Sequence, residues 1–165
     1  MKKLLYAAVI AFTVTAANAD PDEPLMSFKV LTPESALELA QATLADCRER
    51  GYQAAVAVVD RFGGVQVILR DRLAGAHNAE TARRKAWTAA AFRTDTLAMG
   101  KATAYDQPAS GLRQLETVLM VGGGVPVQAA GSVVGAVGVS GAPGGQADDD
   151  CARAGIAAIA DSLEF

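Results

Sequence analysis

The sequence contains few of the residues that build metal centres and catalytic triads. Its 165 residues include one histidine, His77, and two cysteines, Cys47 and Cys151. A zinc site needs three or four converging ligands, which a lone histidine and two scattered cysteines do not supply. No Ser-His-Asp or Cys-His arrangement can be built by spacing, so the sequence offers no hydrolase.

Excess positive charge and long apolar runs are also lacking. The chain has 15 Lys and Arg against 18 Asp and Glu, a formal net charge of −3. Proteins that wrap nucleic acid carry clustered Lys and Arg, so we expect no nucleic-acid partner. The apolar run at residues 4–17 is shorter than the roughly 20 residues that cross a bilayer, and no later segment is long enough. We therefore expect no stable membrane insertion.

The first nineteen residues are typical of a secretory signal peptide. Lys2 and Lys3 precede the apolar run, and Ala17-Asn18-Ala19 is a small-residue cleavage site. Removal of this segment takes away two positive charges, so the net charge moves from −3 to −5. We predict an exported protein, periplasmic or secreted, whose residues 20–165 form a single domain.

Turn signals predict two β-hairpins. Short β-rich runs at 54–60 and 65–70 flank a turn that contains two glycines. Similar runs at 125–129 and 132–140 flank Ala130-Gly131. Each pair is typical of an antiparallel hairpin.

Helix signals surround these hairpins. Thr32 and Pro33 are a good helix start, as N-cap and first helical residue. We expect further helices at 79–94 and from 152 onward. The segment 112–121 is ambiguous between helix and strand, and its β-branched end favours a strand at its close. The order helix, hairpin, helix, hairpin, helix predicts an α+β domain with one antiparallel sheet covered by helices.

The two cysteines have two interpretations. Both fall on predicted helices, and in an oxidising compartment they can form a disulfide. They can equally be small buried hydrophobic side chains. The separation of their Cα atoms decides between the two, and the sequence does not supply it.

A glycine-rich loop, residues 141–146, precedes the last helix and suggests a phosphate cradle. It fails the motif tests, because no Walker lysine follows and the Rossmann spacing is absent. Asp148, Asp149 and Asp150 would repel an anion there, whereas acidic residues suit the start of a helix. We interpret the triplet as capping residues.

His77 and Lys85 are the candidate ligand-binding residues that the chemistry alone suggests. His77 lies in a loop before an alanine-rich helix, where it can be a single axial ligand to haem iron or an exposed histidine without a role. Lys85 interrupts the small residues of 82–91, so it can face an anion such as a carboxylate or propionate. Alternatively, Arg83, Arg84 and Lys85 form a solvated helix face.

Several segments together resemble the GlcG/HbpS-like haem-binding (haem-degrading) family. They are residues 56–60 with Gly63-Gly64, then 82–92, 123–127, 135–141 and 150–155. The same module occurs at the C-terminus of some cobalamin adenosyltransferases. The resemblance implies a profilin-like fold, with a five-stranded antiparallel sheet and helices on both faces. It also implies homo-oligomers from dimers to octamers, packed through the alanine-rich helix and glycine-rich strands.

The resemblance further implies haem as cofactor, with a role in haem handling or redox-stress sensing. The positions that match the family are Lys85, Thr88, Phe92 and the glycine-rich loop. An iron-ligand role for His77 rests on its being the only imidazole, since the chain departs from the family at 73–78. The alternative iron ligands are one tyrosine and three methionines: Tyr105, Met26, Met99 and Met120.

Two functions therefore remain open at this stage. The first is an exported haem-binding oligomer in which His77, Lys85, Thr88 and Phe92 hold the cofactor. The second is a module that binds a small organic acid through Lys85 and the loop amides, without haem or catalysis. The sequence leaves enzymatic activity undecided, because no acid–base pair or nucleophile compels it.

Overall fold

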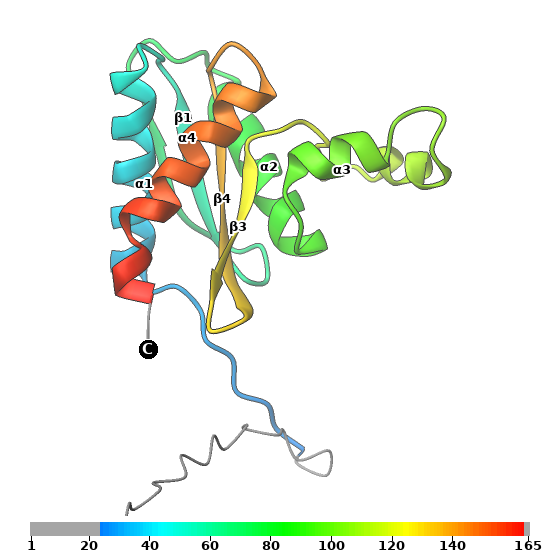
Figure 1. The fold of residues 1–165 in the computed structure, drawn as a ribbon, viewed down its shortest axis with the longest axis horizontal. Coiled ribbons are helices and arrows are strands. Elements are labelled where there is room, and N and C mark those ends of the chain that lie inside the picture. The colour runs from blue at the N-terminus through cyan, green and yellow to red at the C-terminus, as the bar shows by residue number, and fades with distance from the viewer. Residues whose placement is uncertain (1–23, 164–165) are drawn as a thin grey trace, which may run out of the picture.

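The computed structural model describes residues 24–163 of the chain (Figure 1). The predicted signal peptide at 1–19 lies outside these described residues. Within them, none of the helices combines the length and apolarity of a membrane span.

One four-stranded antiparallel sheet forms the centre of the fold, in the order β2-β1-β4-β3. The first predicted hairpin is β1 (Ala55–Asp60) with β2 (Val65–Arg70), and the second is β3 (Gly124–Ala129) with β4 (Ser132–Ser140). The two hairpins join through the central pair of β1 and β4. Both hairpins are therefore confirmed.

The tight turn between β3 and β4 follows from its two residues. Ala130 and Gly131 both have positive φ, 46° and 75°. Two-residue turns of this kind match the right-handed twist of the strands that they join.

The implied five-stranded sheet is wrong for the described residues, which contain four strands. The first residues of segment 112–121, expected to end as a strand, belong to a 3-10 helix (Pro108–Gln114), and residues 115–121 form no strand. Beyond this 3-10 helix, the carbonyl oxygens of Glu116, Thr117 and Val118 accept hydrogen bonds from Arg84. Since a side chain takes up these backbone groups, the segment makes no strand ladder.

Helices cover both faces of the sheet, as expected. Figure 1 shows α1 (Pro33–Glu49) beside α4 (Gly145–Ala158), with α2 (Asn78–Phe92) on the other side of the strands. Val56 and Val58 of β1 belong to the core with α1 and α4, whereas Ala55 and Ala57 belong to the core with α2. This alternation follows from the two-residue period of a strand.

Small residues bring α2 unusually close to the sheet. Ala82 and Ala86 are fully buried against β1 and β4. A Cβ on Gly138 of β4 would overlap the backbone of α2 at Ala82. The alanine-rich helix and the glycine-rich strand thus pack against one another within the subunit.

Cys47 of α1 and Cys151 of α4 form a disulfide, with their Cα atoms 5.4 Å apart. Both side chains are completely buried. Of the two interpretations of the cysteines, the structure therefore shows the bridge. It joins two neighbouring helices on one face of the sheet.

Two shorter helical segments complete the described chain. The helix α3 (Thr96–Ala102) and the 3-10 helix after it extend sideways from the sheet, as Figure 1 shows at the right. A second 3-10 helix (Ala160–Leu163) follows α4.

Candidate functional site

A pocket of about 520 Å³ opens between the first turn of α2 and the loop that precedes α4. Its walls come from three parts of the chain: residues 77–85 of α2 and its cap, residues 119 and 121, and residues 140–148. It brings the first turns of α2, with His77 and Lys85, next to the glycine-rich loop, which is far from them in the sequence. We therefore describe the candidate site from this pocket.

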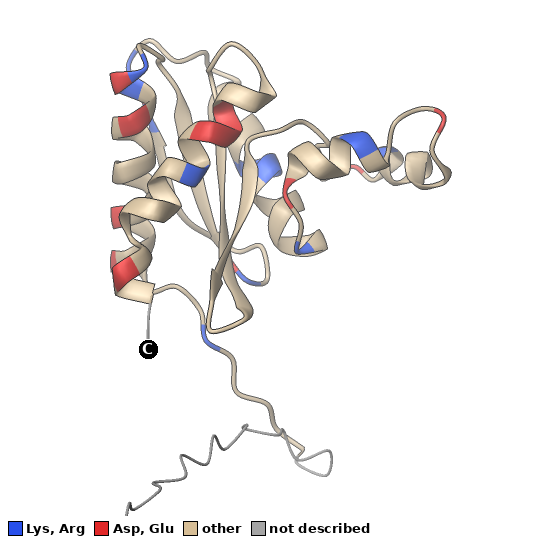
Figure 2. Ribbon diagram, in the orientation of Figure 1, with Lys and Arg blue, Asp and Glu red and all other residues tan. Residues whose placement is uncertain are grey.

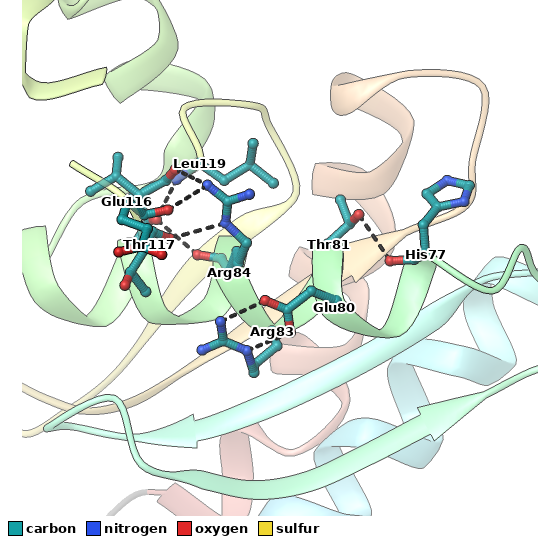
Figure 3. Close-up of polar contacts among 10 residues, drawn as sticks. His77, Glu80, Thr81, Arg83, Arg84, Glu116, Thr117 and Leu119 are labelled. Atoms are coloured by element: carbon teal, nitrogen blue, oxygen red, sulfur yellow. Dashed lines mark hydrogen bonds and ion pairs between the residues drawn. The ribbon is translucent and has the colours of Figure 1, made fainter. Parts of the chain in front are cut away.

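His77 lies at the N-cap position of α2. Its backbone oxygen accepts a hydrogen bond of 3.0 Å from the Thr81 hydroxyl, while its side chain does not cap the helix. Figure 3 shows the imidazole extending away from the helix. The side chain is exposed and makes no hydrogen bond with any other described residue. The ring nitrogens are therefore available to a ligand at the rim of the pocket.

Gly75 leaves the space that this imidazole occupies. A Cβ at position 75 would lie 2.8 Å from Cε1 of His77, closer than ordinary packing permits. A larger residue there would push the ring out of its position beside the pocket.

Lys85 lines the pocket, and its side chain is only 3% exposed. Its Nζ donates to Asp148 Oδ2 at 2.6 Å and to the backbone oxygen of Val139 at 2.9 Å. The other carboxylate oxygen of Asp148 accepts from the amide of Ala142 at 2.9 Å. The pair therefore ties α2 to β4 and to the glycine-rich loop.

Burial raises the pKa of the Asp148 carboxyl, and the charge and hydrogen bond of Lys85 oppose this rise. Lys85 thus does not belong to a solvated face, which corrects one interpretation of the Arg83-Arg84-Lys85 run. Because two of its three ammonium protons already have partners within the protein, it is poorly placed to be the main anion ligand.

Thr88 and Arg84 hold in place the backbone that forms the apolar wall of the pocket. The buried Thr88 hydroxyl donates to the Arg84 oxygen at 2.8 Å and accepts from the Leu119 amide at 2.9 Å. The Arg84 guanidinium donates to the Thr117 and Val118 oxygens at 3.3 and 2.7 Å, as Figure 3 shows in part. These bonds hold the segment that places Leu119 and Val121 at the pocket.

Arg84 is therefore a residue that the sequence analysis missed, since a charged run usually faces solvent. Its one available signal is its spacing, four residues before Thr88 on the same helix face. The three backbone oxygens that it binds are 32 to 34 positions away in the chain. Because these oxygens are so far away in the sequence, no local pattern indicates that Arg84 bonds to them.

Phe92 does not line this pocket. It is the last residue of α2, at the opposite end from His77. A helix rises 1.5 Å per residue, so the two ends of this one are roughly 20 Å apart. The structure brings His77 and Lys85 together but leaves Phe92 apart from them.

The alternative iron ligands lie elsewhere. In the part of the chain that the structure describes, Tyr105 and Met26 are exposed away from this pocket, and Met99 and Met120 do not line it either. Among the proposed ligands, His77 is thus the one at this site. No three His, Cys, Asp or Glu residues within 24–163 come together as a metal-binding group.

A second pocket, of about 620 Å³, lies along the edge strand β3 between Arg93 and Arg153. None of the predicted site residues lines it. The Arg153 guanidinium bonds to Asp149 at 2.6 Å and contacts Asp95 at 3.4 Å. This second pocket is larger than the His77 pocket, but two of its charged residues, Asp95 and Arg153, are already paired with one another.

The chain belongs to the family of HbpS-like haem-degrading proteins, whose model matches residues 31–157. Among solved structures, it is similar to a double mutant of HbpS from Streptomyces reticuli. The two share 36% identity and a TM-score of 0.78, over 89% of this chain and 99% of the other. An ORFY protein from Klebsiella pneumoniae shares 26% identity and a TM-score of 0.81, over 86% and 98% of the two chains.

Two further similarities involve PduO proteins. A PduOC–haem complex shares 29% identity and a TM-score of 0.74, over 79% of this chain and 95% of the other. A corrinoid adenosyltransferase PduO from Citrobacter freundii is 33% identical over 142 residues, which cover 83% of this chain. The chain spans 40% of the length of that curated relative.

Proposed function

We propose that this protein binds haem in the pocket between α2 and the glycine-rich loop, with His77 as the axial ligand of the iron. The observation that carries the proposal is the exposed His77 imidazole, which has no hydrogen-bond partner among residues 24–163 and stands at the rim of this pocket. A similar protein, PduOC, is known in complex with haem.

The donor set of the pocket fits such a group. Haem brings four nitrogen ligands and supplies redox chemistry at its iron, so the protein needs to add only one or two axial ligands. One imidazole is therefore sufficient where a zinc site would need three or four protein ligands. Leu119 and Val121 provide the apolar wall against which a flat ring can pack.

The other predicted residues have supporting positions in this proposal. Lys85 holds Asp148 and the loop in place beneath the pocket. Thr88 and Arg84 hold the backbone that carries Leu119. Phe92 is too distant to contact a group bound at His77.

Hemin titration of the apoprotein tests the proposal. The sample must carry no polyhistidine tag, because His77 is the only histidine of the chain. We expect a shifted Soret band that saturates at one hemin per chain. His77→Ala should lose the wild-type spectrum, and free imidazole should restore it by filling the vacated position.

Tyr105→Ala is the matched control, because Tyr105 is a fully exposed alternative ligand away from the pocket. It should leave the spectrum unchanged. No Soret shift in the wild type at stoichiometric hemin overturns haem binding. An unchanged spectrum in His77→Ala overturns only the assignment of the ligand.

We also propose that the protein is exported and assembles into homo-oligomers of two to eight subunits. The Cys47–Cys151 disulfide supports export, since such bonds persist in oxidising compartments. Mass spectrometry of periplasmic and secreted fractions should find a mature chain that begins at Asp20. Light scattering during size-exclusion chromatography would show a monomer if the assembly is wrong.

A further inference from the structure

Two helices begin at the same pocket, and neither start is capped by a side chain. His77 at the start of α2 and Gly144 at the start of α4 make no side-chain cap bond, and both residues line the pocket. The first-turn amides of a helix have no acceptor within the helix, and they favour negative charge. The carboxylate of Asp148 accepts from Ala142 in the preceding loop.

Asn78 adds a second, independent feature. The residue is 6% exposed and lines the pocket. Its Oδ1 accepts a hydrogen bond from the Ser140 hydroxyl at 3.3 Å, whereas its Nδ2 has no partner among the described residues. This amide nitrogen faces the pocket without a protein acceptor, so it can donate to a bound acceptor.

The glycines around Nδ2 keep this approach open. A Cβ at Gly141 would lie 3.1 Å from Nδ2, and one at Gly75 would lie 3.6 Å from it. Side chains at either position would cover the amide. Gly141 also has a φ of 137°, which favours glycine there.

The aspartates at the start of α4 repel an anion less strongly than three adjacent carboxylates in the sequence suggest. Figure 2 shows acidic residues in the first half of this helix. However, Asp148 is paired with Lys85 and Asp149 with Arg153, both at 2.6 Å. Asp150 accepts a hydrogen bond from Gln146 and acts electrostatically on Arg50, at the end of α1.

The remaining polar groups at the pocket are therefore mostly donors. Arg84 adds a positive charge whose guanidinium is held by backbone oxygens. Lys85 neutralises the one carboxylate that lines the pocket. This arrangement of donors and charge is complementary to an acceptor-only group.

We infer that this pocket recognises a carboxylate, bound by Nδ2 of Asn78 and the first-turn amides of α4. The backbone amide of Asn78 itself already donates to the Gly75 oxygen at 3.0 Å. The inference rests on the proposed function for its choice of pocket, but it does not need the iron. The carboxylate can belong to a haem propionate or to a free small organic acid. Lys85, which the sequence suggested as the anion ligand, acts instead by neutralising Asp148.

Two pairs of probes separate these sources. Acetate and its neutral analogue acetamide are titrated into the apoprotein at constant ionic strength. Nuclear magnetic resonance follows the Asn78 side-chain amide and the backbone amide of Gly145, which lines the pocket and remains in every variant. Hemin and hemin dimethyl ester, whose propionates carry no charge, are titrated in parallel and followed at the Soret band. Acetate but not acetamide should shift the Asn78 signals if free acids bind. Hemin should bind at least tenfold more tightly than its ester if propionates bind.

Asn78→Asp is the informative variant, because it keeps the shape and the oxygen that Ser140 bonds while replacing the donor by a negative oxygen. It should weaken carboxylate binding at least tenfold, since it exchanges attraction for repulsion. Gln128→Glu introduces the same change on the exposed face of β3 and should have no effect. Thermal unfolding of both variants checks that they fold.

Each outcome decides one of the two proposals. Folded Asn78→Asp that binds acetate and hemin like the wild type overturns the carboxylate site, while haem binding stands. Acetate binding that depends on Asn78, without any Soret shift on adding hemin, supports the site and overturns haem binding. No acetate binding together with equal affinity for hemin and its ester also overturns the site.

Discussion

The ammonium of Lys85 lies 2.6 Å from the carboxylate of Asp148, although the two residues are 63 positions apart in the chain. Both side chains are almost fully buried. The pair joins the middle of α2 to the start of α4, two helices on opposite faces of the sheet. It lies beside the C-terminal end of β4, where Lys85 also donates to the Val139 oxygen and where the candidate pocket opens.

Lys85→Met should destabilise the protein by about 3–5 kcal/mol, because it leaves the Asp148 carboxylate buried without its cation. Urea unfolding followed by circular dichroism measures this free energy. Arg83→Met is the control; it removes a surface pair with Glu80 and should cost less than about 1 kcal/mol. The double variant Lys85→Met/Asp148→Leu should recover most of the loss, and a fully additive result would contradict the coupling.

Asp149 should make stability depend on pH. Burial raises the pKa of its carboxyl, and the hydrogen bond from Arg153 opposes the rise. The folded state therefore binds this proton more tightly than the unfolded chain. The protonated Asp149 carboxyl therefore adds to the free energy of unfolding. This contribution is fully present below the ordinary pKa of 3.8 and is lost as pH rises through the higher pKa of the folded state.

Asp149→Asn removes this titration. From about pH 4 towards neutrality, the unfolding free energy of the wild type should fall relative to that of the variant. Unfolding in urea at a series of pH values measures the difference. Glu38→Gln, on the exposed face of α1, should follow the wild-type curve. Parallel curves for the wild type and Asp149→Asn would show that Asp149 does not contribute.

Thr88→Val should loosen the apolar wall of the pocket. It keeps the volume of the side chain but leaves the Leu119 amide without its acceptor, at a cost of about 1–3 kcal/mol. Hydrogen exchange should show faster exchange at Leu119, and hemin affinity should fall. Thr94→Val serves as the control, because the Thr94 hydroxyl bonds to the oxygen of Phe92, at the far end of α2 from the pocket. Unchanged exchange at Leu119 would refute the assigned role.

Loss of the disulfide should lower stability without changing the fold. Replacing Cys47 and Cys151 together by alanine should cost about 2–5 kcal/mol, since the bridge constrains the unfolded chain over a long loop. Thiol titration of the unreduced, denatured wild type should find no free thiol. The same transition temperature for the double variant and the oxidised wild type would contradict the prediction.

Local signals predicted much of the fold. The hairpins at 55–70 and 124–140 were recognisable because β-branched residues flank turns whose glycines permit positive φ. The first helix was recognisable from its cap, where the Thr32 hydroxyl accepts from the Ser35 amide at 3.2 Å. The fifth strand failed as a prediction because the partners of 116–119 are side chains of a helix some thirty residues earlier.

The candidate site was only partly predictable. His77 and Lys85 stood out by their rarity, one as the single histidine and the other as a cation among alanines. Arg84 and Asn78 did not stand out, since an arginine in a charged run and an asparagine at a helix start are common on surfaces. Their importance comes from the backbone oxygens that Arg84 binds and from the burial of Asn78.

The sequence by itself determined the elements, their order and the membership of an HbpS-like family, because caps, turns and periodic apolar residues act between near neighbours. Only the tertiary structure decided that Cys47 meets Cys151, that Lys85 neutralises Asp148, and that two helix starts open on one pocket. Each of these depends on how distant segments pack against the sheet. Patterns among residues that are close in the sequence do not indicate how distant segments pack.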